Sequence, residues 1–170
     1  MTTVVSRSLA ASIALLVLAD WTTKLWITRR MALGETWAVL DGWVYLVHRQ
    51  NPGVAFSMFA DLPADWRVPL LTLVSVIGVV LFARILHSTS DALAKVAAGV
   101  VMAGAIGNLG DRLLNGHVTD FVLVRFFPFV FNFADAAITV GGILLAVRLA
   151  VNENALEPAT SHRPELTPDA

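Results

Sequence analysis

Aspartate and asparagine side chains recur beside the ends of apolar segments in this 170-residue chain. Asn108 and Asp111 are three residues apart, and Asn132 and Asp135 repeat that spacing after a loop that contains Asp120. Residues three apart share a helix face, so each pair would present an amide and a carboxylate together. Carboxylates crowded at a low-dielectric boundary cannot all ionise freely, and one is pushed to hold a proton near neutral pH. An acid and a base of the same residue type is the arrangement that aspartic proteases use.

Two positive side chains accompany these acids. Arg112 directly follows Asp111 and is the one positive charge that the sequence places next to the carboxylates. Lys24 follows Asp20 by four residues in another apolar segment, so the two share a helix face with the acid first, the favourable order. Pairing lowers the desolvation cost of both charges. The pair could therefore either fix the helix near the membrane interface or support a site.

The same polar residues allow interpretations from other classes of protein. A small proton- or cation-conducting membrane carrier also uses intramembrane carboxylates, and Asp20, Asp111 and Asp135 would form its relay. A scaffold subunit would use the polar side chains only to lock helices together. Asp135 could also act simply as a helix cap, because Asp is favoured at helix starts. A carrier predicts polar residues throughout the spans, whereas these carboxylates gather at one end, which favours a site near the membrane surface.

The composition indicates a membrane protein. Apolar residues make up 56% of the chain, charged residues only 15%, and the mean hydropathy is +0.70. An average soluble domain has about 25% charged residues. The absence of cysteine excludes a disulfide scaffold, a thiolate metal site and a Cys nucleophile. The net charge of −1 gives no indication of a nucleic-acid partner, and the scattered histidines form no metal-ligand cluster, so we expect no metal and no cofactor.

Four segments are long and apolar enough to cross a bilayer as helices, which takes about 20 residues each. They run over about residues 8–27, 68–86, 92–109 and 134–151. The first is predicted to be a retained helix and not a signal peptide, because no small-x-small cleavage site follows it. Four spans put both termini on one side of the membrane. Positive residues divide 5 against 6 between the two faces, so they do not set the orientation.

The segments outside the spans suggest a small β element. Residues 29–66 include an apolar, partly β-branched run at 43–47, a turn signal at Asn51-Pro52-Gly53 and a second short run at 54–59. Another extended run, 121–124, lies between the third and fourth spans. The predicted fold class is therefore a mainly α membrane protein with four transmembrane helices and a small β element and loop on one membrane face.

The predicted domain organisation is one membrane-embedded domain over residues 1–151 and a tail over 152–170. The tail contains prolines and little apolar content, so we expect it to be flexible. The loop over residues 36–59 could lie on the membrane and cover the site. We predict that this loop moves about Gly53, because glycine and the adjoining turn offer a hinge.

Four motifs, in order along the chain, resemble those of the prolipoprotein signal peptidase family, also called signal peptidase II. They are Asp20-Trp-Thr-Thr-Lys24; Asn51-Pro-Gly-Val-Ala-Phe-Ser57; Gly107-Asn-Leu-Gly-Asp-Arg112 with Gly116-His-Val-Thr-Asp-Phe121; and Phe131-Asn-Phe-Ala-Asp135 with Ile138 and Gly141. The resemblance covers about residues 8–150. It departs at Trp21, where the family often has Gln.

The resemblance implies an intramembrane aspartic endopeptidase with Asp120 and Asp135 as its catalytic dyad. Its substrates would be prolipoproteins that carry diacylglycerol on the lipobox cysteine, cleaved just before that cysteine, and its inhibitor would be globomycin. Other residues of the motifs would bind substrate or inhibitor, or support the site: Asn51, Gly53, Asn108, Asp111, Arg112 and Asn132. Asp20 and Lys24 would have a structural or supporting role.

The resemblance also implies a location and partners. The protein would lie in the bacterial cytoplasmic (inner) membrane, with cytoplasmic termini, a cytoplasmic tail and a site on the extracytoplasmic face, toward the outer leaflet. Its partners would be lipidated precursors and membrane lipid, with no nucleic acid. We expect a monomer.

Overall fold

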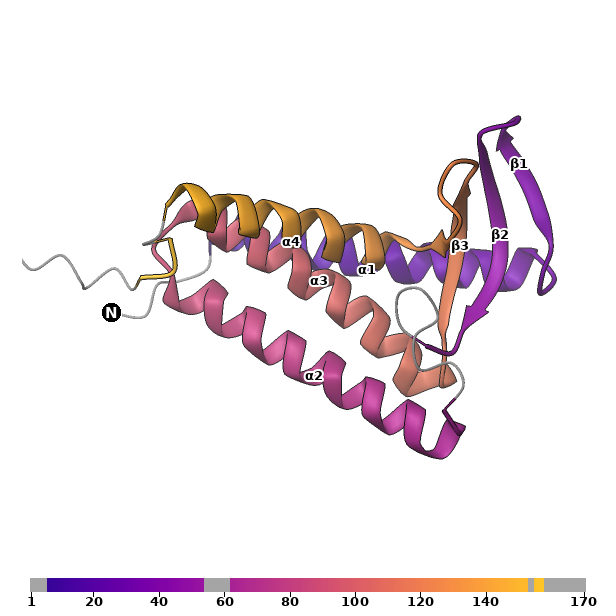
Figure 1. Cartoon of the computed structure of the whole chain (residues 1–170), viewed down its shortest axis with the longest axis horizontal. Helices are drawn as coiled ribbons and strands as arrows, with labels where there is room; N and C mark the ends of the chain where they lie inside the picture. The colour runs from indigo at the N-terminus through magenta and orange to yellow at the C-terminus, as the bar shows by residue number, and fades with distance from the viewer. Residues whose placement is uncertain (1–5, 54–61, 153–154, 158–170) are drawn as a thin grey trace, which may run out of the picture.

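The computed structural model describes residues 6–53, 62–152 and 155–157. Within these ranges lie four long helices and four strands. The helices are α1 (Arg7–Arg30), α2 (Ala64–Ser88), α3 (Ala92–Asn115) and α4 (Phe133–Val151), and the strands are β1 (Thr36–Leu40), β2 (Val44–Asn51), β3 (Val118–Val124) and β4 (Val130–Phe131). The helices form an elongated bundle with the sheet at one end, and α1 begins and α4 ends at the other (Figure 1).

All four helices are long and apolar enough to cross a membrane, which confirms the four predicted spans. They extend beyond the predicted bounds. α3 continues to Asn115, so Asp111 and Arg112 lie inside the helix and not just beyond it. The helix ends at Gly116, which adopts a left-handed conformation with φ +73° and donates its N–H to the Arg112 carbonyl. Glycine permits this cap because it has no Cβ to clash.

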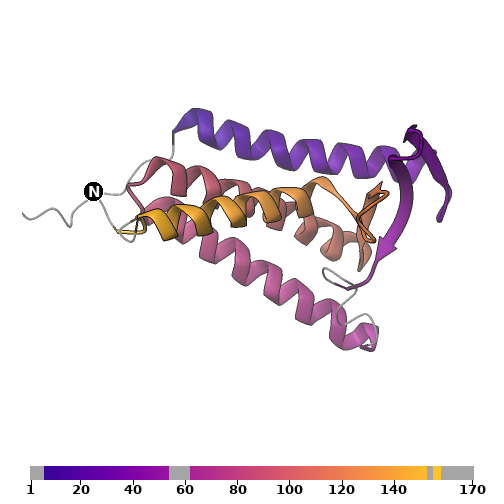
Figure 2. The same ribbon diagram turned by 45° about the horizontal axis from the view of Figure 1, so that its top comes forward.

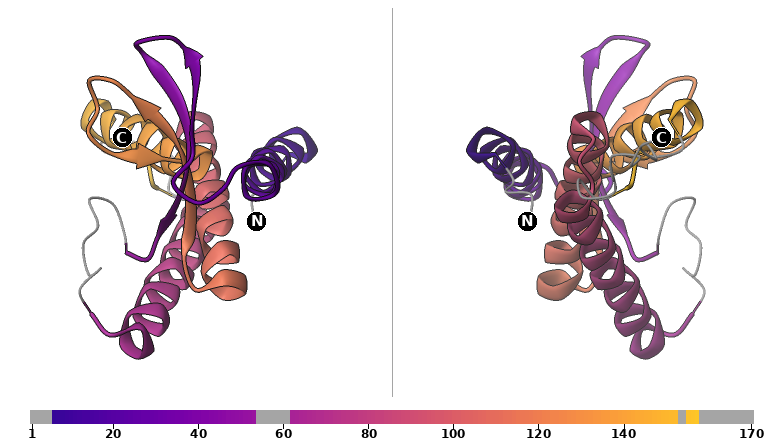
Figure 3. Two further views of the ribbon diagram at one scale, coloured as in Figure 1. Left: turned by 90° about the vertical axis from the view of Figure 1, so that its right-hand side faces the viewer. Right: turned by 90° about the vertical axis from the view of Figure 1, so that its left-hand side faces the viewer.

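α3 is the central helix of the bundle. It contacts each of the other three helices and is the most buried of the four. α1 and α2 lie on opposite sides of it (Figure 2), and an end-on view places α3 among the other three (Figure 3). Its contact with α4 is backbone to backbone: a Cβ on Gly141 would lie 2.9 Å from the Ala97 carbonyl oxygen. Small residues allow such close approach in lipid, where the packing of helices drives their association.

The four strands form one antiparallel sheet in the order β1-β2-β3-β4. It joins the segment after α1 to the segment after α3, and the register pairs Tyr45 with Leu123 and Arg49 with Asp120. The run predicted at 121–124 lies in β3, which begins earlier, at Val118. The sheet is thus built from two segments that are far apart in the sequence.

β1 and β2 form a hairpin that lies before the turn signal at residues 51–53. The run 43–47 overlaps β2, but it pairs with β1 through a turn at Gly42, whose φ is +75°. The predicted second run, 54–59, lies outside the described residues. Asn51 ends β2, paired with Val118, and its side-chain Oδ1 accepts from the Gly53 N–H, so the turn signal at residues 51–53 is an Asx-turn after the strand. Its strand conformation follows from β3, which binds the edge of β2 opposite β1 and so extends it.

Buried apolar side chains pack the sheet against the end of α1. Ile27 and Met31 pack with Phe121 of β3, and the Phe121 ring contacts Phe133 edge-on with centroids 5.2 Å apart. The neighbouring His48 side chain is also buried, with Nδ1 2.9 Å from the Met31 carbonyl oxygen. This packing fixes the backbone on either side of Phe121 and therefore the position of Asp120.

At the opposite end of the bundle, the chain after α4 contacts the α2–α3 turn. Ala155 is buried and its carbonyl accepts a hydrogen bond from the Thr89 hydroxyl. Asp91 caps α3 through the Ala94 N–H and pairs with Arg148 of α4 at 2.5 Å. Within the predicted tail, Ala155 and Glu157 therefore contact the α2–α3 turn through hydrogen bonds to their carbonyls. Residues 153–154 and 158–170 lie outside the described part.

The close α3–α4 contact predicts different effects for two adjacent glycines. Gly141→Ala should lower the free energy of unfolding by about 1–3 kcal/mol, because its Cβ would overlap the α3 backbone. Gly142→Ala is the matched control, since a Cβ there meets nothing within 4 Å. Unfolding would be measured in bicelles for both variants. An equal loss of free energy of unfolding in Gly141→Ala and Gly142→Ala would contradict this close packing of α3 and α4.

Candidate active site

Asp120 and Asp135 approach each other from two elements that meet where the sheet joins the bundle. Asp120 projects from β3 and is 2% exposed, whereas Asp135 lies in the first turn of α4 and is partly exposed. Asn132 connects them. Its Nδ2 donates to Asp120 Oδ1 at 2.7 Å, and its Oδ1 accepts from the Asp135 N–H at 2.9 Å. One asparagine therefore contacts both acidic residues.

The link to Asp135 is a reciprocal helix cap. While Asn132 accepts from the Asp135 N–H, Asp135 Oδ2 lies 3.4 Å from the Asn132 N–H. This is a capping box, which satisfies helix N–H groups that would otherwise lack partners. The capping role considered from the sequence is therefore real, and Asp135 keeps its other carboxylate oxygen for a second partner.

Two further amides reach the carboxylates from other elements. Asn51, at the end of β2, donates from Nδ2 to Asp120 Oδ2 at 2.9 Å, and its own Oδ1 accepts from the Gly53 N–H at 2.9 Å. Asn108 of α3 donates from Nδ2 to Asp135 Oδ1 at 2.7 Å. Each carboxylate thus receives amide hydrogen bonds that orient it.

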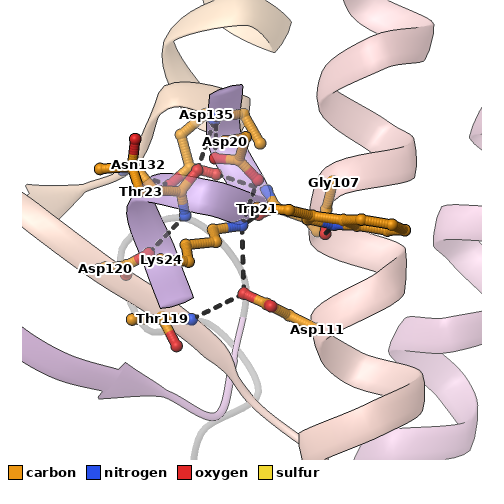
Figure 4. A network of polar contacts seen from close by, with 12 residues as sticks. Asp20, Trp21, Thr23, Lys24, Gly107, Asp111, Thr119, Asp120, Asn132 and Asp135 are labelled. Atoms are coloured by element: carbon orange, nitrogen blue, oxygen red, sulfur yellow. Dashed lines mark hydrogen bonds and ion pairs between the residues drawn. The ribbon is translucent and has the colours of Figure 1, made fainter. Parts of the chain in front are cut away.

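A buried lysine lies behind this pair. The Lys24 Nζ of α1 lies 2.7 Å from Asp20 Oδ2 and 3.1 Å from Asp111 Oδ2 (Figure 4). It also lies 3.0 Å from Asn108 Oδ1. Its side chain is 3% exposed. The pairing of Asp20 with Lys24 predicted from their spacing is confirmed. In an apolar bundle this ammonium depends on its oxygen partners, because an isolated buried charge is very costly.

The acids that pair with Lys24 also hold the backbone beside the two aspartates. Asp20 Oδ1 accepts from the Ala134 N–H at 3.0 Å, one residue before Asp135. Asp111 Oδ2 accepts from the Thr119 N–H at 3.0 Å, one residue before Asp120. Lys24 is therefore the centre of a network that ties α1 and α3 to the starts of α4 and β3.

The structure adds a second cation to the predicted cluster of acids. The prediction gathered Asp111, Asp120 and Asp135 into one crowd and named Arg112 as the adjacent positive charge. In the structure Asp111 pairs with Lys24, which comes from a helix distant in the sequence. Sequence spacing could not reveal this contact, because it depends on how α1 packs against α3.

Arg112 points toward α2 and the end of β2. Its Nη2 donates to the Gly53 carbonyl at 3.0 Å, and its Nη1 lies 3.3 Å from Ser75 Oγ on α2. Arg112 thus fixes the backbone after Asn51 against two helices. Ser75 and Thr119 were not predicted as site residues. Ser75 was detectable as a polar residue in an apolar span, whereas Thr119 contributes its backbone N–H and leaves no sequence signal.

Burial and charge shift the acidity of Asp120. Burial raises the pKa of this carboxyl to about 7, the nearby charge of Asp135 adds to the increase, and hydrogen bonds from Asn51 and Asn132 oppose it. Asp120 therefore exchanges its proton near neutral pH. A carboxyl with such a pKa can serve as a general acid or base in water-dependent chemistry.

The fold and the site together define a multi-pass membrane protein with two hydrogen-bonded aspartates at the junction of a helix bundle and a small sheet. The family model of signal peptidase (SPase) II matches residues 12–151. This chain belongs to the signal peptidase II family, which confirms the resemblance seen in the four motifs and makes the protein a peptidase.

Individual relatives agree with this assignment. The lipoprotein signal peptidase of Staphylococcus carnosus is 32% identical over 85% of this chain and 91% of its own length. The lipoprotein signal peptidase of Streptococcus pyogenes serotype M3 is 37% identical over 87% of this chain and 96% of its own length. A bacterial membrane enzyme structure obtained by the in meso method at 2.3 Å resolution has the same fold, with a TM-score of 0.81 at 24% identity over 89% of this chain and 93% of that one.

The network around Lys24 predicts a large loss of stability when its charge is removed. Lys24→Met should lower the free energy of unfolding by about 3–5 kcal/mol, because it leaves Asp20 and Asp111 buried without their cation. Lys95→Met on α3 removes the same charge from a side chain that forms no ion pair with the residues that the structure describes, and should change the free energy of unfolding by less than about 0.5 kcal/mol. Unfolding in bicelles would measure both. A similar change in the free energy of unfolding for Lys24→Met and Lys95→Met would contradict a central role for Lys24.

Proposed function

We propose that this protein removes signal peptides from diacylglyceryl-modified prolipoproteins by an aspartic mechanism, cleaving just before the lipidated lipobox cysteine. The curated relatives are named lipoprotein signal peptidases. The observation that carries the catalytic assignment is the link between Asp120 and Asp135 through Asn132, together with an Asp120 pKa of about 7. Such a pair can hold one proton between two carboxyl groups at neutral pH.

In this mechanism Asp135 is the base and Asp120 the acid. Asp135 lies at the N-terminal end of α4, where the helix dipole favours a negative charge, and it accepts from Asn108. It takes a proton from water as the oxygen attacks the scissile carbonyl carbon. Protonated Asp120 donates a hydrogen bond to the carbonyl oxygen, the C–N bond breaks, and the leaving amine receives a proton from the pair.

The surrounding residues support this chemistry without reacting. Asn51, Asn108 and Asn132 orient the two carboxyl groups through their amides. Arg112 holds the Gly53 backbone beside the pair, where substrate or globomycin would bind. The network of Lys24 with Asp20 and Asp111 keeps the two aspartate-bearing segments in place. The proposed reaction uses no metal and no cofactor.

The proposed orientation follows from the substrate. The protein would be a monomer in the bacterial inner membrane, with the sheet end toward the outer leaflet and the termini in the cytoplasm. The lipid anchor would hold the precursor's cysteine near the interface, where water can also reach Asp120 and Asp135. Cysteine labelling at the exposed Asp41 of the β1–β2 turn would test this orientation in intact cells.

The carrier interpretation has less support from the geometry. Asp20, Asp111 and Asp135 lie close together around Lys24 and Asn108, and do not form a series through the depth of the bundle. Proton or cation uptake into liposomes that contain the purified protein would test this alternative directly.

The dyad assignment predicts that either carboxyl is essential. Asp120→Asn and Asp135→Asn should each lower the cleavage rate by roughly 10²–10⁴-fold, because the pair then lacks its acid or its base. The measurement is release of the signal peptide from a diacylated precursor in liposomes, with and without globomycin. Asp41→Asn, on an exposed turn, is the control. Near-normal cleavage by either dyad variant, inserted at normal levels, would refute the assignment.

The acidity of Asp120 predicts the pH dependence. Since its pKa is raised to about 7, the proton that the reaction needs is lost as the pH rises through this value, and kcat should fall. The Asn51 hydrogen bond stabilises the ionised carboxylate, so Asn51→Ala should raise the pKa and move the alkaline limb to higher pH. Gln50→Ala, exposed on the same strand, is the control. If the alkaline limb of the pH profile of kcat did not move in Asn51→Ala, or moved to lower pH, this role of Asn51 would be contradicted.

A further inference from the structure

Trp21 lies between α1 and α3 at the level of the site. Its indole Nε1 donates to the Gly107 carbonyl at 3.2 Å (Figure 4). The ring also covers Gly110, where a Cβ would lie 2.5 Å from Cζ2 and 2.9 Å from Cε2. The indole therefore occupies the space that a side chain at Gly110 would need. One residue before Trp21 is Asp20, and three residues after it is Lys24.

α1 contacts α3 more extensively than it contacts α4. On the side of α1 toward α4 there is an apolar cavity of about 400 Å³, lined in part by Leu16, Ala19, Val140 and Ala134. The spacing between α1 and the rest of the bundle is therefore set chiefly where α1 meets α3. Along that contact, Gly107 approaches so closely that a Cβ there would lie 2.6 Å from Asp20 Oδ2.

We propose that Trp21 is a positioning residue for catalysis: its indole, seated over Gly107 and Gly110, sets the α1–α3 spacing that holds Lys24 against Asn108 and Asp111. The proposal rests on the proposed function of the site. Trp21 does not touch the reacting groups. It acts through Lys24, because Asn108 binds Asp135 and Asp111 holds the backbone beside Asp120.

This role explains why the glycines and the tryptophan occur together in this chain. A glycine at position 110 leaves room for a ring, and the ring replaces the side-chain volume that the glycine lacks. Without the indole, α1 and α3 would be free to approach or slide. The Lys24 ammonium would then lie at a different distance from Asn108, and Asp135 would lose its fixed orientation. Misplacement of a catalytic group by about 1 Å can cost roughly 10²-fold in rate.

The first test compares two tryptophans of α1. Trp21→Ala should lower kcat roughly 10–100-fold with KM changed less than about twofold, because the orientation of Asp135 is lost while substrate binding persists. Trp21→Phe, which keeps a ring over Gly110, should recover part of kcat. Trp26→Ala is the matched control, since Trp26 is 44% exposed against 42% for Trp21 and faces Trp37. Equal kcat values for Trp21→Ala and Trp26→Ala would overturn the proposal.

The second test separates positioning from a general loss of folding. Gly110→Ala in the native background should lower kcat, because its Cβ displaces the indole. The same change in the Trp21→Ala background should cost little, since the ring is gone. Such non-additivity is the signature of two residues in contact. Equal loss of kcat from Gly110→Ala in both backgrounds would overturn the proposal.

The outcomes also distinguish this inference from the proposed function. If the native protein does not cleave a diacylated precursor, or if Asp120→Asn cleaves normally, the proposed function fails. If the native protein cleaves and depends on Asp120, but Trp21→Ala matches Trp26→Ala, only the role of Trp21 fails. Unfolding in bicelles confirms that each compared variant is folded at the assay temperature.

Discussion

The site depends on one buried ammonium group. Lys24 lies in an apolar bundle, and its charge is stable there because Asp20, Asp111 and Asn108 surround it with oxygen atoms. Each of these partners has a second contact, to the Ala134 N–H, the Thr119 N–H or the Asp135 carboxylate. The requirement to neutralise a single cation therefore also determines where the starts of α4 and β3 lie.

The sheet contributes the other half of this arrangement. Phe121 packs against Ile27 of α1 and against Met31, the residue that follows this helix, which fixes β3 over the bundle and buries Asp120 beside it. Burial in turn raises the pKa of Asp120 to about 7, so the packing of one aromatic ring bears on the acidity of the adjacent carboxyl. Rigid support and unusual acidity thus come from the same contacts, and the partly exposed Asp135 faces this buried partner across Asn132.

The prediction of the site from the sequence succeeded for local features and failed for distant ones. The Asp20–Lys24 pair follows from helical spacing, and the four spans follow from runs of apolar residues. Asp111 does lie beside the segment that carries Asp120, but its pairing with Lys24 was not predicted, because Lys24 comes from another helix. The hairpin that β2 forms with β1 through the turn at Gly42 was not predicted from the sequence.

The sequence by itself determined the number of spans, the family and the residues that carry polar chemistry, because these depend on local composition and on motifs. Tertiary structure alone decided that Asp111 also pairs with Lys24 and that Asn132 links Asp120 to Asp135. It also decided that the two loops form one sheet and that Trp21 fills the space at Gly110. Those outcomes depend on how helices far apart in the chain pack, and no local pattern specifies the distance between them.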